Sequence, residues 1–266
     1  MAGLPGILRQ WNPGIAPGLS LWVDGSDSKS LTVDGGGVGG GGSNISAIRD
    51  KSGLNIELVQ GTASNQPVLT SNINRLQTIG FRGENYVSTT TSYFPSIFNN
   101  TNAISQFTIL NLRSNNTQGI TSIVDSNYNI VSSSQFSFGL TPNNFRLFKN
   151  GNGTQLGITL PTPSNFFVEG YLQSNRTTLY LLNNNSSEFV LAPTPINNLT
   201  QFLIGRRPGI GANVFYGDIG EILIYNSNVY TSNTAFHPQI EGYLAWKWGL
   251  RSLLESTHPY KNRYPS

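Results

Sequence analysis

FYGDIGEILIYN (residues 215–226) and HPQIEGYLAWKWGL (residues 237–250) are the stretches that decide the fold. The first has the apolar, β-branched and aromatic content of a strand, punctuated by glycines. The second has the apolar spacing of a helix, and a basic, aromatic coda follows it in HPYKNRYPS (residues 258–266). A single helix at the end of a chain that otherwise reads as strands predicts a β-sandwich with one helix packed on it.

The helix is expected over residues 234–249. Thr234 stands at the N-cap position, and Gly249 stands where a helix commonly ends in a left-handed residue. Trp246 and Trp248 lie on different faces, so we expect one of them against the sandwich and the other under the arm or coda. The apolar positions that share one face are Ile240, Tyr243, Leu244 and Trp248.

The rest of the chain is patterned as about a dozen short strands bounded by Asn, Gly, Pro or Ser. This pattern predicts an all-β, two-sheet antiparallel jelly-roll sandwich. Residues 1–17 are interrupted by Pro and Gly and are expected to form an N-terminal arm, with residues 18–266 as one domain that includes the helix. The arm is expected either to dock on a neighbouring subunit or to wrap the edge of its own sandwich.

Composition excludes several classes of function. Charged residues make up 11% of the chain and the net charge is +3, which is too little and too scattered for nucleic-acid binding. There is no Cys, and therefore no disulfide or thiolate chemistry. No signal peptide and no apolar stretch of membrane-spanning length is found, so no membrane insertion is expected.

The C-terminal pairing of GDIGEILIYN with QIEGYLAWKWGL and HPY resembles the signature of concanavalin A-like (laminin-G-like) jelly-roll domains, which are common in viral capsid, fibre and tail proteins. PGLSLWVDGSD resembles the first strand of that family, IRDKSG a connecting turn, and QTIGFRGENYVS a later strand. The resemblance covers residues 17–259. The signature residues are Gly217, Gly220, Glu221, Trp246, Trp248, Gly249, His258 and Pro259.

This resemblance implies a non-enzymatic structural component of a virus particle: a capsid-associated, minor capsid, fibre or tail protein. Its partners would be other virion proteins or copies of itself. It would lie on the outer or capsomer-facing surface of the particle, after synthesis in the host cytoplasm without a signal peptide. The alternative is a lectin-like adhesin that binds cell-surface glycans for host attachment. The loop aromatics that would then stack on sugars are Trp11, Tyr93, Phe94 and Tyr128.

Catalytic patterns are missing, so we expect no enzymatic activity. Glycan hydrolases of this fold carry E-x-D-x-x-E or E-x-D-x-E on one strand, and no such run occurs here. The nearest pair, Asp218 and Glu221, is three residues apart on a strand and should point to opposite faces. Glu169 is a lone acid in the middle of a strand. No G-x-S-x-G elbow is present.

Metal and cofactor motifs are also weak. His237 and His258 are the two histidines, each followed by Pro, and no His-X-X-His motif or carboxylate–histidine metal cluster is recognised, so the sequence predicts no zinc site. The glycine-rich run of residues 34–43 contains a formal G-x-G-x-x-G, but the turn-rich SNISAIRDKSG that follows it is no helix start, so a loop is expected rather than a dinucleotide site.

The resemblance leaves open whether calcium is bound, because sandwiches of this fold often hold calcium between loops. It identifies no calcium site. Calcium needs several converging carboxylate and carbonyl oxygens. The acidic loop residues available for it are Asp24, Asp27, Asp34, Asp50, Asp125 and Asp218.

Overall fold

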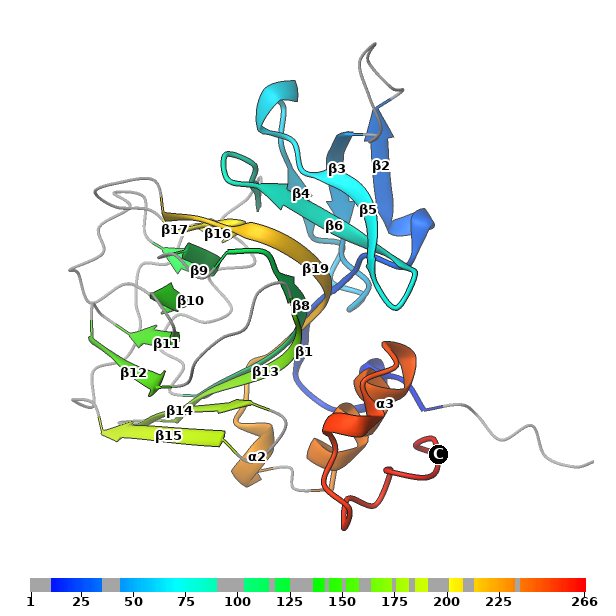
Figure 1. Cartoon of the computed structure of the whole chain (residues 1–266), viewed down its shortest axis with the longest axis vertical. Helices are drawn as coiled ribbons and strands as arrows, with labels where there is room; N and C mark the ends of the chain where they lie inside the picture. Colours follow the sequence, from blue (N-terminus) through cyan, green and yellow to red (C-terminus); the bar gives the residue numbers. More distant parts are fainter. Residues whose placement is uncertain are drawn as a thin grey trace, which may run out of the picture.

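A computed structural model of the chain gives its architecture (Figure 1). It describes residues 11–34, 44–89, 103–114, 118–124, 136–141, 144–149, 152–157, 164–173, 176–181, 185–190, 201–207, 213–232 and 235–266. Tyr93, Phe94, Asp125, Tyr128 and Thr234, for which the sequence makes predictions, lie outside these residues. No helix within them is long and apolar enough to cross a membrane.

The strands of the first half are β1 (Leu19–Asp24), β2 (Leu31–Asp34), β3 (Asn44–Arg49), β4 (Glu57–Val59), β5 (Val68–Ile73), β6 (Leu76–Arg82), β7 (Val87–Thr89), β8 (Ala103–Leu112) and β9 (Gln118–Val124). Those of the second half are β10 (Phe136–Thr141), β11 (Asn144–Lys149), β12 (Asn152–Gly157), β13 (Ser164–Gln173), β14 (Arg176–Leu181), β15 (Asn185–Val190), β16 (Gln201–Ile204), β17 (Arg206–Arg207), β18 (Asn213–Val214) and β19 (Tyr216–Tyr225). The α-helices are α2 (Val229–Ser232) and α3 (His237–Lys247), and short 3-10 turns include Pro13–Ile15 and Arg251–Leu253.

The fold is a curled antiparallel β-sandwich with α3 near the C-terminus, as the sequence predicts. Strand β19 is its central element, since it pairs with β1, β6 and β8, and β8 pairs in turn with β13. Figure 1 shows the N-terminal strands β2 to β6 on one side of β19 and the strands β9 to β15 on the other. Residues 44–49, expected to be turn-rich, form β3, which pairs with β2 across the glycine-rich run.

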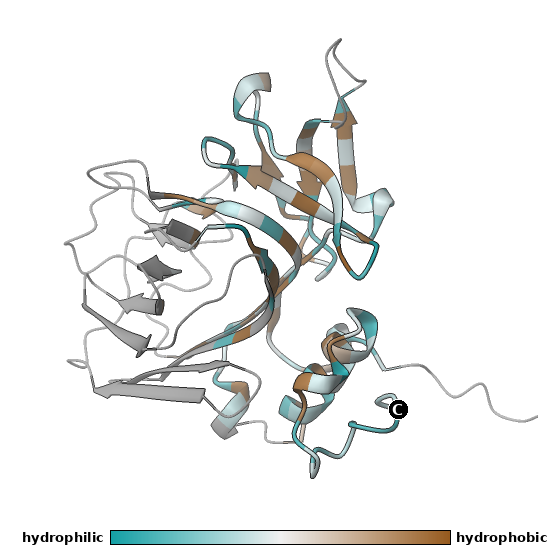
Figure 2. Cartoon of the chain, viewed as in Figure 1, coloured by the Kyte–Doolittle hydropathy of each residue, from teal (hydrophilic) through white to brown (hydrophobic). Residues whose placement is uncertain are grey.

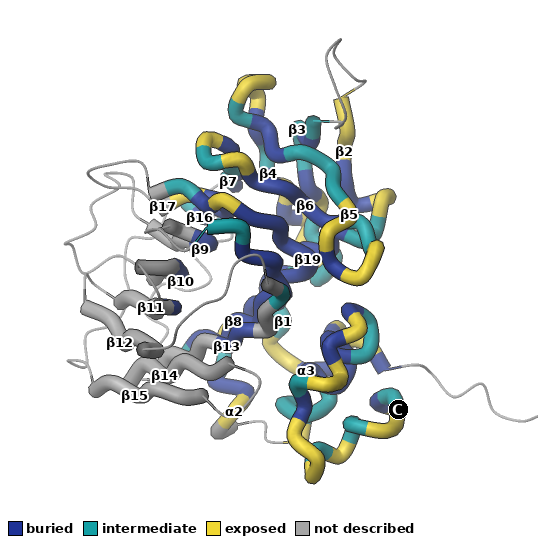
Figure 3. Tube along the Cα trace, in the orientation of Figure 1, coloured by how far each residue is buried: buried dark blue, intermediate teal, exposed yellow. Residues whose placement is uncertain are grey.

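Two apolar clusters meet along β8 and β19. The larger one fills the sandwich, and the smaller one lies between the outer face of these strands and α3. Nine of the ten residues of β19 are buried, and Figures 2 and 3 show its apolar and buried course through the molecule. A strand buried on both faces reads as a nearly continuous apolar run, which is why residues 219–225 show little alternation.

Helix α3 is shorter than the predicted 234–249. Phe236 occupies the N-cap without a side-chain hydrogen bond, and Pro238 falls in the first turn, where its missing N–H is harmless. The end of the helix is as expected: Gly249 has φ +67°, and the Leu250 N–H donates to the Ala245 carbonyl at 2.8 Å. This is the Schellman arrangement, which only a residue tolerant of positive φ completes without strain.

Gly220 allows the helix to approach β19. A Cβ at this position would lie 2.9 Å from the ring of Trp248, which is fully buried. The indole of Trp248 therefore lies directly on the strand backbone, and a larger residue at 220 would push the helix away. The packing of α3 depends on this pairing of the smallest side chain with the largest.

We predict that Trp248→Ala lowers the free energy of unfolding by about 3 to 5 kcal/mol, because it leaves a cavity on β19. Tyr216→Ala, at an exposed aromatic of the same strand, is the matched control and should change it by less than about 0.5 kcal/mol. Urea denaturation followed by circular dichroism measures both. Equal stability of the two variants would refute this role of Trp248.

Candidate functional site

A buried network of charges fastens α3 to β1 and β19. Glu221 is fully buried on β19 and accepts hydrogen bonds from the indole N–H groups of Trp22 and Trp248 at 2.6 and 2.7 Å. Tyr243 donates its hydroxyl at 3.0 Å, and the ammonium of Lys247 lies 2.8 Å away. Burial raises the pKa of Glu221, while Lys247 opposes the rise. Such a carboxylate is tolerable in the interior because donors surround it.

Asp24 at the end of β1 extends this network. Its carboxylate is 2.7 Å from the ammonium groups of both Lys51 and Lys247, and Lys51 also contacts Asp27 at 2.9 Å. Burial alone would raise the pKa of Asp24, but the two lysines outweigh it and the pKa is lowered. Lys247 is thus held between two carboxylates, which fixes the C-terminal half of α3.

The prediction that Asp218 and Glu221 point to opposite faces of β19 is wrong, because the register of the strand shifts between Ile219 and Glu221. Ile219 and Ile222, the residues that follow the two acids, both enter the larger apolar cluster. Asp218 is fully buried, accepts from the Thr70 hydroxyl at 2.8 Å and the Asn72 amide at 3.0 Å, and pairs with Arg113 at 2.9 Å. It therefore fastens β5 and β8 to β19, whereas Glu221 fastens α3. The two acids serve separate attachments and do not face each other across a substrate site.

An aromatic groove lies where the N-terminal segment, α3 and the coda meet. It has a volume of about 570 Å³, and its lining residues are Trp11, Asn12, Tyr243, Trp246, Lys247 and Tyr264. Trp11 is buried beside Tyr243, with ring centres 5.9 Å apart, while Trp246 and Tyr264 are half-buried and meet edge to face at 6.2 Å. This hollow, called the aromatic groove from here on, thus combines flat apolar rings with the polar side chains of Asn12 and Lys247.

The coda closes one side of the aromatic groove by crossing α3. Trp246 donates its indole N–H to the Tyr260 carbonyl at 2.8 Å, and a Cβ at Gly242 would lie 2.6 Å from the Cβ of Tyr260. The coda therefore lies against the helix, where Gly242 leaves room for it.

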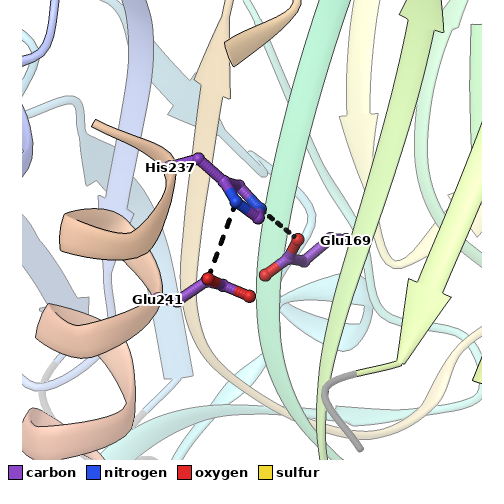
Figure 4. A group of neighbouring side chains, drawn as sticks. All are labelled: Glu169, His237 and Glu241. Atoms are coloured by element: carbon purple, nitrogen blue, oxygen red, sulfur yellow. Dashed lines mark hydrogen bonds and ion pairs between the residues drawn. The ribbon is translucent and has the colours of Figure 1, made fainter. Parts of the chain in front are cut away.

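A second cluster joins α3 to strand β13 (Figure 4). Glu169, only 2% exposed, lies with its Oε2 3.0 Å from His237 Nε2. The other ring nitrogen of His237 is 3.6 Å from Glu241 Oε2, one helical turn further on, and His258 Nε2 is 3.1 Å from that same oxygen. The sequence suggested no carboxylate–histidine group. The structure corrects this, because the fold assembles one from three segments.

The charges of this cluster depend on one another. Burial alone would lower the pKa of His237, but Glu169 and Glu241 raise it to about 8. Burial, followed by the charge of Glu169, raises the pKa of Glu241. The pKa of His258 is lowered by burial and by His237. Two carboxylates therefore share a confined space whose negative charge a cation or a proton must balance.

The structure separates the predicted site residues. Of the four proposed glycan-stacking aromatics, Trp11 lines the aromatic groove, and the other three lie outside the described residues. The candidate calcium ligands within the described residues are engaged by protein donors instead: Asp50 accepts from the Trp22 backbone N–H at 2.8 Å, and Asp34 from Ser46 at 2.8 Å and Gln66 at 2.9 Å. The sequence missed Tyr264, whose place in the groove depends on how the coda folds back.

No known protein-family profile matches this sequence, and no curated protein is significantly similar to it. Solved structures are similar in fold. Domain 4 of AbnA, an extracellular GH43 arabinanase from Geobacillus stearothermophilus, in complex with arabinotriose, matches with a TM-score of 0.52 at 12% identity, covering 78% of this chain and 91% of that one. The chain has a concanavalin-like β-sandwich fold.

Two botulinum neurotoxin structures are also similar. The binding domain of neurotoxin DC in complex with rat synaptotagmin II gives a TM-score of 0.51 at 14% identity, over 79% of this chain and 48% of that one. A structure of neurotoxin type C, concerned with its interaction with two ganglioside molecules, gives 0.50 at 14%, over 78% and 47%. This chain spans about half the length of these toxin domains. The likeness at such identity shows the fold alone.

We predict that Asp24→Asn lowers the free energy of unfolding by about 2 to 3 kcal/mol at neutral pH, because it leaves two lysines short of a carboxylate. Because folding lowers the pKa of Asp24, its carboxylate stabilises the folded state fully at pH values above the ordinary pKa of 3.8. This stabilisation is lost as the pH falls through the lower, folded-state pKa. Urea denaturation at a series of pH values should show the two proteins converging in acid.

Glu57→Gln is the matched control, since Glu57 forms an exposed pair with Arg49 at 3.9 Å. Its effect should stay below about 0.5 kcal/mol at every pH. An Asp24→Asn penalty that does not shrink in acid would show that the lysine pairing contributes nothing to stability.

Proposed function

We propose that this protein is a glycan-binding module and that the aromatic groove holds the sugar. The observation that carries this proposal is the meeting of Trp11, Trp246 and Tyr264 in one hollow. Pyranose and furanose rings present C–H faces that pack on flat aromatic rings, while their hydroxyl groups need hydrogen-bond partners. The groove offers both kinds of contact, and its volume falls within the roughly 300 to 1,000 Å³ of small-ligand sites.

The polar groups of the aromatic groove favour recognition of hydroxyl groups. Asn12 is exposed, and its Oδ1 accepts from the Gly14 N–H at 3.0 Å, while its amide nitrogen carries two N–H donors that suit a sugar hydroxyl. Lys247 is held by Asp24, Glu221 and the Tyr243 hydroxyl, and its ammonium is fully engaged. Lys247 therefore forms part of the wall of the aromatic groove, and the sugar is bound by neutral hydrogen-bond donors and by aromatic stacking.

The structural neighbours support the choice of a saccharide as the class of ligand. One is an arabinanase domain in complex with arabinotriose, and another is a neurotoxin described by its interaction with gangliosides. Each statement concerns that protein. For the present chain they support choosing a saccharide as the first ligand to test, ahead of a peptide or a nucleotide.

We infer that the module binds without cleaving. The two neighbouring carboxylates, Glu169 and Glu241, do not line the aromatic groove, and both engage His237. A glycosidase needs its acid and its nucleophile or base on either side of the scissile bond. Incubation with a bound oligosaccharide should therefore release no reducing ends, and release that is lost in Glu169→Gln would overturn this inference.

Membership of a virus particle and contacts with other virion proteins stay predictions from the sequence resemblance. None of the neighbours described above is a particle protein. A glycan-binding sandwich on a particle surface would combine both hypotheses, because many weak sites on one particle act together. Mass spectrometry of purified particles tests this setting independently of the ligand.

We predict that Trp246→Ala weakens glycan binding at least tenfold, because it removes a stacking face from the aromatic groove. The ligand is first identified on a glycan array that includes arabino-oligosaccharides and ganglioside oligosaccharides. Isothermal titration with the best saccharide then measures the affinity. Asn12→Ala should weaken binding several-fold through the loss of hydrogen bonds.

The control for this series is Tyr216→Ala, which removes an exposed aromatic outside the aromatic groove and should leave the affinity unchanged. Circular dichroism confirms that each variant is folded. An array without any specific saccharide, or a saccharide bound equally well by Trp246→Ala, would exclude the groove as the glycan site.

A further inference from the structure

Three side chains capable of binding a metal converge beside α3. Glu169 comes from β13, and His237 and Glu241 come from the first turns of the helix, where i and i+4 share a face (Figure 4). Each offers one ligand atom, and these atoms lie within 4.8 Å of one another. The side chains of His237 and Glu241 are 16% and 12% exposed, so the cluster is sheltered from solvent and still reachable by an ion.

The spacing of these atoms suits a transition metal. Zinc binds imidazole nitrogen and carboxylate oxygen at roughly 2.0 to 2.2 Å, which places neighbouring ligands of a tetrahedron about 3.4 Å apart. His237 approaches Glu169 through Nε2 at 3.0 Å and Glu241 through Nδ1 at 3.6 Å, and one ion takes only one of these nitrogens. With one ligand atom from each side chain, the three atoms lie within 4.8 Å of one another. Small side-chain rotations would bring the three atoms onto one ion.

We propose that Glu169, His237 and Glu241 form a binding site for a divalent transition-metal ion, with zinc as the ion to test. Two carboxylates and one neutral imidazole carry a charge of −2, which a divalent ion neutralises. Imidazole together with carboxylate ligands selects zinc-like ions over the oxygen-bound calcium and magnesium. Three protein ligands leave a fourth position for water.

His258 orients this site from the coda. The Tyr260 backbone N–H donates to His258 Nδ1 at 3.2 Å, so the proton of a neutral His258 is on Nε2. That N–H points at Glu241 Oε2, 3.1 Å away. An outer hydrogen bond of this type fixes the direction of a ligating carboxylate. His258 is therefore a positioning residue.

The ion would fasten three segments that are distant in sequence: β13, α3 and the coda. It would act at the first turns of α3, whereas Lys247 and the Glu221 network act at the other end. Metal binding should therefore raise the melting temperature of the whole domain. The site does not share a lining residue with the aromatic groove, so the metal proposal stands or falls independently of the glycan proposal.

The test begins with the full chain stripped of metal by a chelator and titrated with zinc chloride in a calorimeter. We expect one zinc ion per chain at micromolar affinity or tighter, and a higher melting temperature. Glu169→Gln and Glu241→Gln should each weaken binding at least a hundredfold. Glu255→Gln, at an exposed acid near the cluster, is the matched control and should bind zinc as the wild type does.

A second measurement needs no variant. The chain has two histidines, so the imidazole ¹⁵N spectrum with and without zinc reports on both. The His237 signals should show metal coordination, and His258 should keep its proton on Nε2. His258→Gln should bind zinc about ten- to a hundredfold more weakly while His237 still coordinates it. A folded wild-type protein that binds no zinc, or an unchanged His237 spectrum, would overturn the proposal.

Discussion

The buried carboxylate of Glu221 is the constraint on which the rest of the structure depends. Four donors from two segments converge on it: Trp22 from β1, Tyr243 and Lys247 from α3, and Trp248 at the C-cap of that helix. An unpaired carboxylate in the interior would cost far more than any one of these bonds returns, so the donors must all be present together. This requirement fixes the position and the rotation of α3 on β19. Hydrophobic packing alone would hold the helix, but it would tolerate sliding and rotation.

Everything on the outer face of the helix follows from that fixed rotation. The side of α3 that carries Trp246 and Lys247 forms one wall of the aromatic groove, and the side that carries His237 and Glu241 is presented to Glu169 on β13. The coda then follows the helix, because Gly242 leaves room for Tyr260. A fault in the Glu221 network should therefore disturb both surfaces, whereas a fault in either surface should leave the network intact.

Local patterns predicted the fold well, and they predicted the sites only in part. Residues 215–226, expected to form a strand, contain β19 (Tyr216–Tyr225), and Gly249 ends α3 in the left-handed conformation. These features depend on neighbouring residues, which the sequence displays directly. The carboxylate–histidine cluster cannot be found from neighbouring residues, because Glu169 and His237 are 68 residues apart and only tertiary packing brings them together.

Two other segments were also misjudged from the sequence. Trp11 reads as part of an irregular arm, yet its indole is buried against Tyr243. Residues 44–49 were misread because a short strand between a glycine-rich run and a turn has too few residues to display its period.

The four tryptophans of the chain offer the most direct test of glycan binding at the aromatic groove. Trp11 and Trp246 line the groove, whereas Trp22 and Trp248 donate their indole N–H groups to Glu221. An ¹H–¹⁵N spectrum of the indole N–H region, recorded during titration with a saccharide that binds, reports on all four at once. We expect the signals of Trp11 and Trp246 to move with saturation, and those of Trp22 and Trp248 to stay in place because their partner is the buried carboxylate. Saturable binding that leaves the Trp11 and Trp246 signals unmoved would contradict this account.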